Sequence, residues 1–246
     1  MRKVVLAALA AGLMAGMTAP ATAGVPMRVE STCPVDDAKF SWTTTASYST
    51  WGQELDAKPI GSWTFPMTIP QCPQSRFPVY KETFTAEEKA AIRALVLTPE
   101  YQAVQEEASY YLLRFVLEKL GGAEPLEPMQ GAWLLMQATW QVRETDPERY
   151  RRYAAETAAA MDLALPALRE SEPADWWFLQ IATANVQRQA GDFAGATARL
   201  DALTGEAPQE GQPAERIALT RHKIAAQDTS PGALPDPRMQ DGHDAH

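Results

Sequence analysis

Cysteine is scarce in this chain: Cys33 and Cys72 are the only two in 246 residues, and each is followed directly by proline. So few cysteines exclude a small domain held together by many disulfides, so a hydrophobic core must supply most of the stability. Histidine is almost as scarce, since His222, His243 and His246 are the only three. Few side chains are therefore available as general bases near neutral pH.

The sequence also lacks the short motifs that mark common active sites. It has no glycine-rich phosphate loop, no Gly-x-Ser-x-Gly sequence and no His-Glu-x-x-His sequence. Several acidic residues lie close together in the sequence, and a charged, solvated helix face explains them better than catalytic carboxylate pairs do. They are Glu87, Glu88, Glu106, Glu107, Asp175 and Asp192. These features favour a chain that binds over one that catalyses.

Basic residues are outnumbered, with 22 Lys and Arg against 31 Asp and Glu and a net charge of −9. This acidity opposes nucleic-acid binding, which depends on neutralising phosphates. It equally opposes attachment to anionic membranes. Beyond the N-terminal segment, no stretch is long and apolar enough to cross a bilayer. The sequence therefore predicts no nucleic-acid partner and no membrane insertion after the leader is removed.

Residues 1–23 have the pattern of a signal peptide. Arg2 and Lys3 precede the short apolar run VVLAALAAGLMAG, and Ala21-Thr22-Ala23 provides a cleavage site before Gly24. A retained N-terminal anchor is the alternative, but the run is short and Pro20 interrupts it. We expect cleavage and a periplasmic or secreted protein.

The composition and periodicity of the remaining chain change at residue 85. Residues 24–84 contain short β-branched and aromatic runs bounded by Pro and Gly, which predict a small β/loop module. Residues 85–227 have helical periodicity and begin with a capping box, Thr85 to Glu88. One helix is expected from Pro99 to Leu120. Residues 228–246 are rich in Pro, Gly and Asp and are expected to be a disordered tail.

The stretch NVQRQAGDFAGATARLDALTGEAP resembles the second half of a tetratricopeptide repeat. The residues that carry the resemblance, in the order of that repeat, are Gly191, Asp192, Phe193, Ala196, Leu200 and Pro208, and Ala184 occupies its small packing position. Thr183 and Gln187 depart from the pattern, and only one unit is recognisable. The resemblance implies a mainly α fold, with diverged neighbouring helix pairs completing the array.

The two Cys-Pro turns and the sequence between them resemble the bacterial DUF2225 family. The matching residues are Cys33, Pro34, Phe40, Asp56, Pro59, Cys72 and Pro73. That family has a Cys-Pro-x-Cys sequence at each turn, whereas this chain has Asp36 and Ser75 at the second cysteine positions. The resemblance implies a degenerate zinc ribbon before the helices and implies no established activity.

This resemblance bears on which role the two cysteines have: zinc ligand, disulfide or redox group. Structural zinc requires four ligands, and Cys33, Asp36 and Cys72 supply at most three, with Ser75 a poor fourth. If the ribbon scaffold is kept without the ion, the two cysteines lie near disulfide range, and an oxidising compartment favours the bond. We therefore predict a Cys33–Cys72 disulfide, with no zinc or other cofactor. A redox role is disfavoured because the chain has no Cys-x-x-Cys sequence.

Three consecutive aromatic residues, Trp176, Trp177 and Phe178, form the candidate partner-binding site. Successive helix positions point about 100° apart, so at least one should lie at a groove or contact, unless two layers bury all three. We predict a non-enzymatic scaffold for a protein or peptide partner. The alternatives are a hydrolase with a site between the two parts, and a structural subunit of an envelope assembly.

Overall fold

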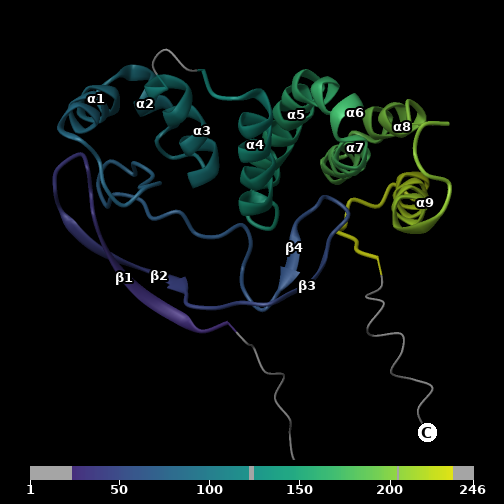
Figure 1. Ribbon diagram of the computed structural model, residues 1–246, viewed down its shortest axis with the longest axis horizontal. Helices are drawn as coiled ribbons and strands as arrows, with labels where there is room; N and C mark the ends of the chain where they lie inside the picture. Colours follow the sequence, from purple (N-terminus) through teal and green to yellow (C-terminus); the bar gives the residue numbers. More distant parts are fainter. Residues whose placement is uncertain (1–23, 122–124, 204, 235–246) are drawn as a thin grey trace, which may run out of the picture.

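A computed structural model of the chain describes residues 24–121, 125–203 and 205–234. The predicted signal peptide and the last twelve residues lie outside the described ranges. The described chain is mainly helical, with a small strand module at its N-terminus, as the sequence predicts. Figure 1 shows the helices in an arch from α1 to α9, with two strand pairs lying across the inner side of the arch.

The strands form two antiparallel pairs. β1 (Pro26–Thr32) pairs with β2 (Lys39–Thr45), and β3 (Thr50–Gln53) pairs with β4 (Pro59–Gly61). The second pair is short and has a register shift between Thr50 and Gly52. Its connecting turn, residues 54–58, is directed into the helical array rather than into solvent, and we call residues 54–57 the hairpin tip.

The two Cys-Pro turns have the same backbone conformation. The Cys33 amide donates to the carbonyl of Ala38, five residues on, and the Cys72 amide donates to that of Phe77, both at 2.9 Å. In each turn the fourth residue after the cysteine has a positive φ, 58° at Asp37 and 55° at Arg76. The structure places Cys33 and Cys72 at disulfide distance, as the sequence predicts, with their Cα atoms 5.3 Å apart.

Asp36 and Ser75 have a local role within these turns. Asp36 Oδ1 accepts a hydrogen bond from the Ala38 amide at 3.1 Å, and Ser75 Oγ accepts one from the Phe77 amide at 3.4 Å. Short polar side chains stabilise tight turns in this way by satisfying an amide two residues on. Asp36 and Ser75 therefore hold the two turns closed.

Several helices begin at a capping residue or a proline, as the sequence predicts at Thr85 and Pro99. Thr85 and Glu88 form both bonds of the capping box at the start of α1, and proline occupies the first turn of α2, α4, α5 and α7. Leu165–Ala167 form a short 3₁₀ turn around Pro166. The helices are α1 (Ala86–Val96), α2 (Pro99–Val104), α3 (Ser109–Leu120), α4 (Pro128–Val142), α5 (Pro147–Ala164), α6 (Leu168–Ser171), α7 (Pro173–Gln189), α8 (Phe193–Asp201) and α9 (Gly211–Ala225).

The expected single helix from Pro99 to Leu120 is broken between α2 and α3. At the break, Glu107 is ion-paired with Arg152 at 2.7 Å, and the Tyr153 hydroxyl donates a hydrogen bond to Glu107. The Ala108 amide donates to the same hydroxyl at 3.1 Å. The Tyr153 hydroxyl thus replaces the helical partner of the Ala108 amide, and the contacts with α5 leave Glu107 largely buried instead of on a solvated face.

The buried core consists of two hydrophobic clusters. The smaller contains Cys33, Cys72 and Phe77 from the Cys-Pro turns together with residues of α1, α2 and α3 such as Ile92 and Leu112. The larger runs from α3 to the turn after α8. Because the smaller cluster joins the turns to the first helices, the β/loop module shares a core with the helical array.

The hairpin tip is enclosed by helices and by the chain after α9. Leu55 and Asp56 are fully buried. The Leu55 amide donates to the Gly232 carbonyl at 2.6 Å, and Glu54 forms a β-bridge with Ala233. Residues 228–234, which the sequence assigns to a disordered tail, are thus ordered against the hairpin. Sequence composition alone missed this because the contacts are made by backbone groups.

The fully buried Arg188 fixes the same segment. Its guanidinium donates hydrogen bonds to the carbonyls of Asp228 and Ser230, the second at 3.0 Å. Asp228 in turn is paired with Lys223 at 2.6 Å and accepts a bond from the Ser230 amide at 2.7 Å. The hydrogen bond and charge of Lys223, followed by Ser230, hold the pKa of Asp228 well below its usual range.

Acidification is therefore expected to loosen residues 228–234. A carboxyl whose pKa is depressed in the fold contributes stability above its unfolded value, about 3.9, and loses it as pH falls. Asp228→Ala should speed hydrogen exchange at the Leu55 amide at neutral pH, after correction for intrinsic rates. Wild-type exchange should accelerate below about pH 4, whereas exchange in the variant should change less.

Asp201→Ala is the matched control, because Asp201 pairs with Arg221 at 2.8 Å and neither residue touches the 228–234 segment in any hydrogen bond or ion pair. Unchanged protection of Leu55 in Asp228→Ala would contradict this assignment.

Candidate functional site

The three consecutive aromatic residues have different environments. Trp176 belongs to the core, 7% exposed, with the Arg169 guanidinium 5.3 Å from its ring centroid. Trp177 is half-buried against the core. Phe178 is also half-buried, but it lines two adjoining hollows. Trp176 is therefore a packing residue rather than part of a partner-binding surface, and Phe178 is the member of the set that lines a groove.

The first hollow lies between α4, α6 and α7. It has a volume of about 420 Å³ and is predominantly apolar. The Trp133 ring lies edge-on to Trp140, with the centroids 5.5 Å apart, which fixes its orientation. The hollow is lined by Met129, Trp133, Leu168, Glu172, Asp175, Phe178 and Leu179.

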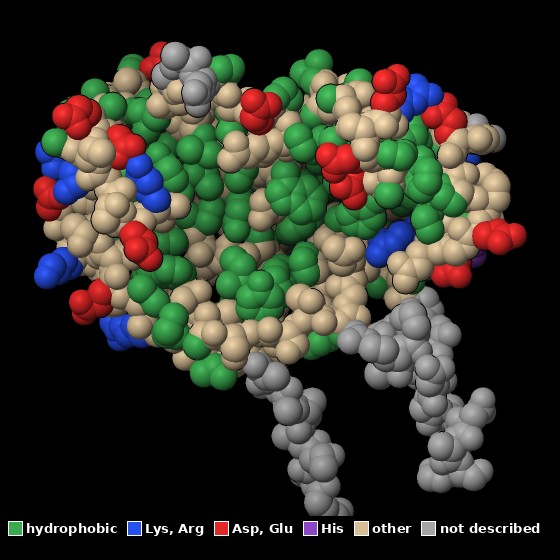
Figure 2. Space-filling view, viewed as in Figure 1, with side chains coloured by type: hydrophobic (Ala, Val, Ile, Leu, Met, Phe, Trp, Pro, Cys, Tyr) green, Lys and Arg blue, Asp and Glu red, His purple; other side chains and the backbone are tan. Residues whose placement is uncertain are grey.

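The second hollow continues from the first toward α9. It has a volume of about 300 Å³, and its lining residues are Gln53, Ala174, Asp175, Phe178, Ile181, Gln212, Pro213 and Arg216. Because Asp175 and Phe178 line both hollows, we treat the two as one groove and call it the Phe178 groove. Figure 2 shows this face hollowed at its centre, with hydrophobic side chains over α4 and acidic side chains beside α7.

The spacing of residues at the start of α7 produces this groove. Glu172, Asp175, Phe178 and Leu179 recur at intervals of three and four, so they share one side of the helix. Arg216 on α9 holds the ring of Phe178 in place, with its guanidinium 5.5 Å from the ring centroid. Arg216 also donates to the Glu54 carbonyl at 3.1 Å. The hairpin tip therefore helps to position Arg216, and through it the ring of Phe178.

The rim of the groove carries negative charge. Glu172 and Asp175 are exposed, and within the described ranges neither carboxylate forms an ion pair with a cation of the chain. Asp175 belongs to the acidic set that the sequence assigned to a solvated helix face. Asp175 does face solvent, but it borders the apolar lining of the first hollow.

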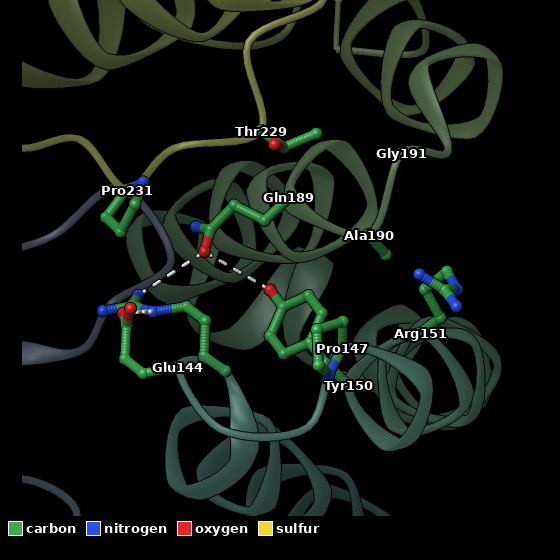
Figure 3. A pocket seen from close by; sticks show the side chains of 10 residues that line it. Glu144, Pro147, Tyr150, Arg151, Gln189, Ala190, Gly191, Thr229 and Pro231 are labelled. Atoms are coloured by element: carbon green, nitrogen blue, oxygen red, sulfur yellow. Dashed lines mark hydrogen bonds and ion pairs between the residues drawn. The ribbon is translucent and has the colours of Figure 1, made fainter.

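A separate cavity of about 460 Å³, which we call the Tyr150 cavity, lies between α5, α7 and residues 229–231. Figure 3 shows Tyr150 and Gln189 pointing toward one another, with Arg151 at the opposite side from Glu144. The side-chain oxygen of Gln189, Oε1, accepts from the Tyr150 hydroxyl at 3.3 Å. Burial raises the pKa of Tyr150 well above its ordinary value.

Two carboxylates of the hairpin tip meet at one arginine, and paired carboxylates are one arrangement that hydrolases use. Glu54 and Asp56 both contact Arg143, at 2.5 and 3.0 Å. The Gln189 amide also donates to Asp56 at 3.2 Å. Burial raises the pKa of Asp56, and the charge of Arg143 acts against that effect. Neither carboxylate lines the Tyr150 cavity or the Phe178 groove. The pair instead attaches the hairpin to the ends of α4 and α7.

The remaining candidates for metal or acid–base chemistry do not converge. His222 lies exposed on α9 and lines neither space, and His243 and His246 fall outside the described residues. Among the residues that the structure describes, no group of three or more His, Cys, Asp or Glu side chains could hold a metal ion. Within the same ranges, no helix combines the length and apolar character needed to cross a membrane.

Comparison of the chain with models of protein families, with curated proteins and with solved structures found no match.

Proposed function

We propose that this chain is an exported, non-enzymatic binding protein whose Phe178 groove takes a segment of a peptide or partner protein. The position of Phe178, half-exposed where two hollows join, is the observation that carries the proposal. A concave, mostly apolar surface with a central aromatic ring is the arrangement that anchors partner segments at interfaces. The cysteine pair at disulfide distance supports a periplasmic or secreted location.

The proposal includes a tetratricopeptide-like helical array. Its support is the close pairing of α7 with α8, in which Ala184 and Ala196 are fully buried and Leu200 nearly so. Gly191, with a φ of 87°, makes the turn between them. Helices α4, α7 and α9 together line the groove. Repeats of this type bind partners on surfaces built from successive helices.

The origin of the N-terminal module is part of the same proposal. The matching conformations of the two Cys-Pro turns support descent from a zinc ribbon of the DUF2225 type, in which a pair of turns once surrounded an ion. In this chain the link between Cys33 and Cys72 joins the turns directly.

Truncation of Phe178 tests the proposed function. A photo-reactive phenylalanine analogue placed at the exposed, groove-lining Ala174 should cross-link a partner in cells of the native host. Adding Phe178→Ala should reduce that product sharply, since loss of a central aromatic anchor costs about 2 kcal/mol, or roughly 30-fold in Kd.

Two controls separate binding from folding. Phe193→Ala removes another half-buried aromatic residue, which lines neither hollow, and should leave the product unchanged. The analogue at Leu163, 81% exposed and outside the groove, should give a different pattern. Equal cross-linking with and without Phe178, at unchanged thermal stability, would refute the proposal.

A further inference from the structure

We infer that the Phe178 groove selects a segment in which an apolar side chain is flanked by lysine or arginine. This inference rests on the proposed function and adds the chemistry of the partner. It is carried by the combination of an apolar floor with an acidic rim whose carboxylates have no ion-pair partner among the described residues.

The rim carboxylates are not used by their own helix. Glu172 occupies the N-cap position of α7, but its side chain makes no capping hydrogen bond. The two aspartate caps do make that bond, Asp146 accepting from Arg149 at the start of α5 and Asp192 from Gly195 at the start of α8. The other glutamate caps, Glu127 of α4 and Glu210 of α9, resemble Glu172 in making none. An acidic first turn is favourable for any helix, but that preference does not require the carboxylates to border an apolar hollow.

The floor beneath the rim suits an apolar side chain. Met129, Leu168 and Leu179 supply aliphatic surface, and Trp133 supplies an aromatic face. A methionine-containing surface adapts to side chains of different shape. A lysine or arginine next to the buried side chain would lie within reach of both carboxylates and of the indole ring, which also attracts cations.

The far half of the groove constrains the rest of the segment. The Arg216 guanidinium donates to the Glu54 carbonyl and lies over the ring of Phe178, so it already has partners within the fold. Gln53 and Gln212 border this half with amide groups, which can bond to an extended peptide backbone. The second half therefore supports main-chain binding, and the acidic first half determines the preferred charge.

The charge of the whole chain acts in the same direction. Acidic residues exceed basic ones, 31 to 22. A net negative protein attracts cationic segments over long range, and this attraction weakens as salt screens it. An anionic partner would meet repulsion both from the whole protein and from the rim.

Three mixtures of capped, fluorescein-labelled octapeptides test the inference on the full exported chain. Each keeps four central positions constant, Lys-Leu-Phe-Lys, Glu-Leu-Phe-Glu or Lys-Ser-Ser-Lys, and varies the outer four. Fluorescence anisotropy should show the tightest binding for the first mixture. The second should bind at least about tenfold more weakly, as expected for like charges placed at a rim, and the third should show no saturable binding.

Rim and control variants locate the effect. Glu172→Gln with Asp175→Asn should abolish the preference between the first two mixtures and flatten the salt dependence of the first. Glu100→Gln with Glu148→Gln makes the same change of charge at exposed first-turn acids of α2 and α5 that have no ion pair among the described residues. This control should keep the preference.

The outcomes distinguish the inference from the proposed function. If the acidic mixture binds as well as the cationic one, and Phe178→Ala abolishes both, the inference is wrong while the proposed function stands. If the cationic preference survives in the rim variant, the inference is also wrong. If no mixture binds in a manner that depends on Phe178, both are refuted.

Discussion

Replacing Cys33 and Cys72 together by alanine is expected to lower the free energy of unfolding by up to about 4 kcal/mol. The two residues are 39 apart in sequence, so their bond closes a long loop and restricts the unfolded chain. Both are also buried in the cluster that joins the Cys-Pro turns to α1, α2 and α3, where Phe77 and Ile92 are fully buried. Loss of the bond should therefore weaken the attachment of the whole N-terminal module.

Urea unfolding followed by tryptophan fluorescence measures this effect. The midpoint should fall in the double variant, and a thiol reductant should move the wild-type midpoint toward it while leaving the variant unchanged. Asp36→Ala with Ser75→Ala serves as a control that removes one hydrogen bond from each turn and keeps the cysteines. This control should lower the free energy of unfolding by less than the double cysteine replacement does. A reductant-insensitive wild type would show that the link contributes nothing to stability.

The second large effect is expected at Arg143. Arg143→Met should destabilise the fold by about 3–5 kcal/mol, the usual cost of leaving a buried charge without its partner. The side chain of Asp56 is fully buried and that of Glu54 is 18% exposed, and both depend on Arg143 for a counter-charge. Methionine keeps much of the volume, so the loss reports on charge more than on packing.

The control is Arg151→Met, an exposed arginine on α5 with no ion pair among the described residues. It should change stability by no more than about 0.5 kcal/mol. Adding Glu54→Gln and Asp56→Asn to Arg143→Met should restore part of the loss, because the unpaired charges are removed. If Arg143→Met and Arg151→Met are equally mild, the ion-pair lock is not a stabilising element.

The pH dependence of Arg143→Met follows from the same contacts. Burial already raises the pKa of Asp56, and removing Arg143 removes the charge that opposes this rise. A carboxyl with a raised pKa in the fold binds a proton that the unfolded chain releases, so stability falls as pH rises from about 3.9 through the folded value. The difference in stability between the variant and wild type should therefore be smallest in acid.

Local patterns predicted the beginnings of helices and the position of the cysteine pair. The capping box at Thr85 and the proline at the start of α2 act within one turn of chain, so a single sequence suffices to find them. The Cys-Pro turns were recognisable for the same reason. The mainly α fold with a small strand module followed from these signals.

Features that depend on distant partners were missed. The break at Glu107 requires Arg152 and Tyr153 from α5, and the order of residues 228–234 requires Arg188 and the hairpin tip. The aromatic set lies on the segment of α7 that contributes Phe178 to the groove, but the sequence could not show which of its three members lines it. Which side of a helix meets a groove depends on its neighbours, and α4 and α9 lie far from Phe178 in sequence.

The hairpin tip also sets a condition on the timing of folding. Its bonds to Arg143, Gln189 and Arg216 span 89, 133 and 162 residues of sequence. The Leu55 amide donates to the carbonyl of Gly232, which lies later still in the chain. A chain that emerges from its N-terminus forms such contacts last, and long sequence separations make folding slow. Glu54 and Asp56 therefore have no counter-charge until Arg143 has emerged, and the Leu55 amide has no partner until almost all of the described chain has emerged. The interval in which this protein most needs protection from aggregation begins with its second strand pair and ends only with residue 232.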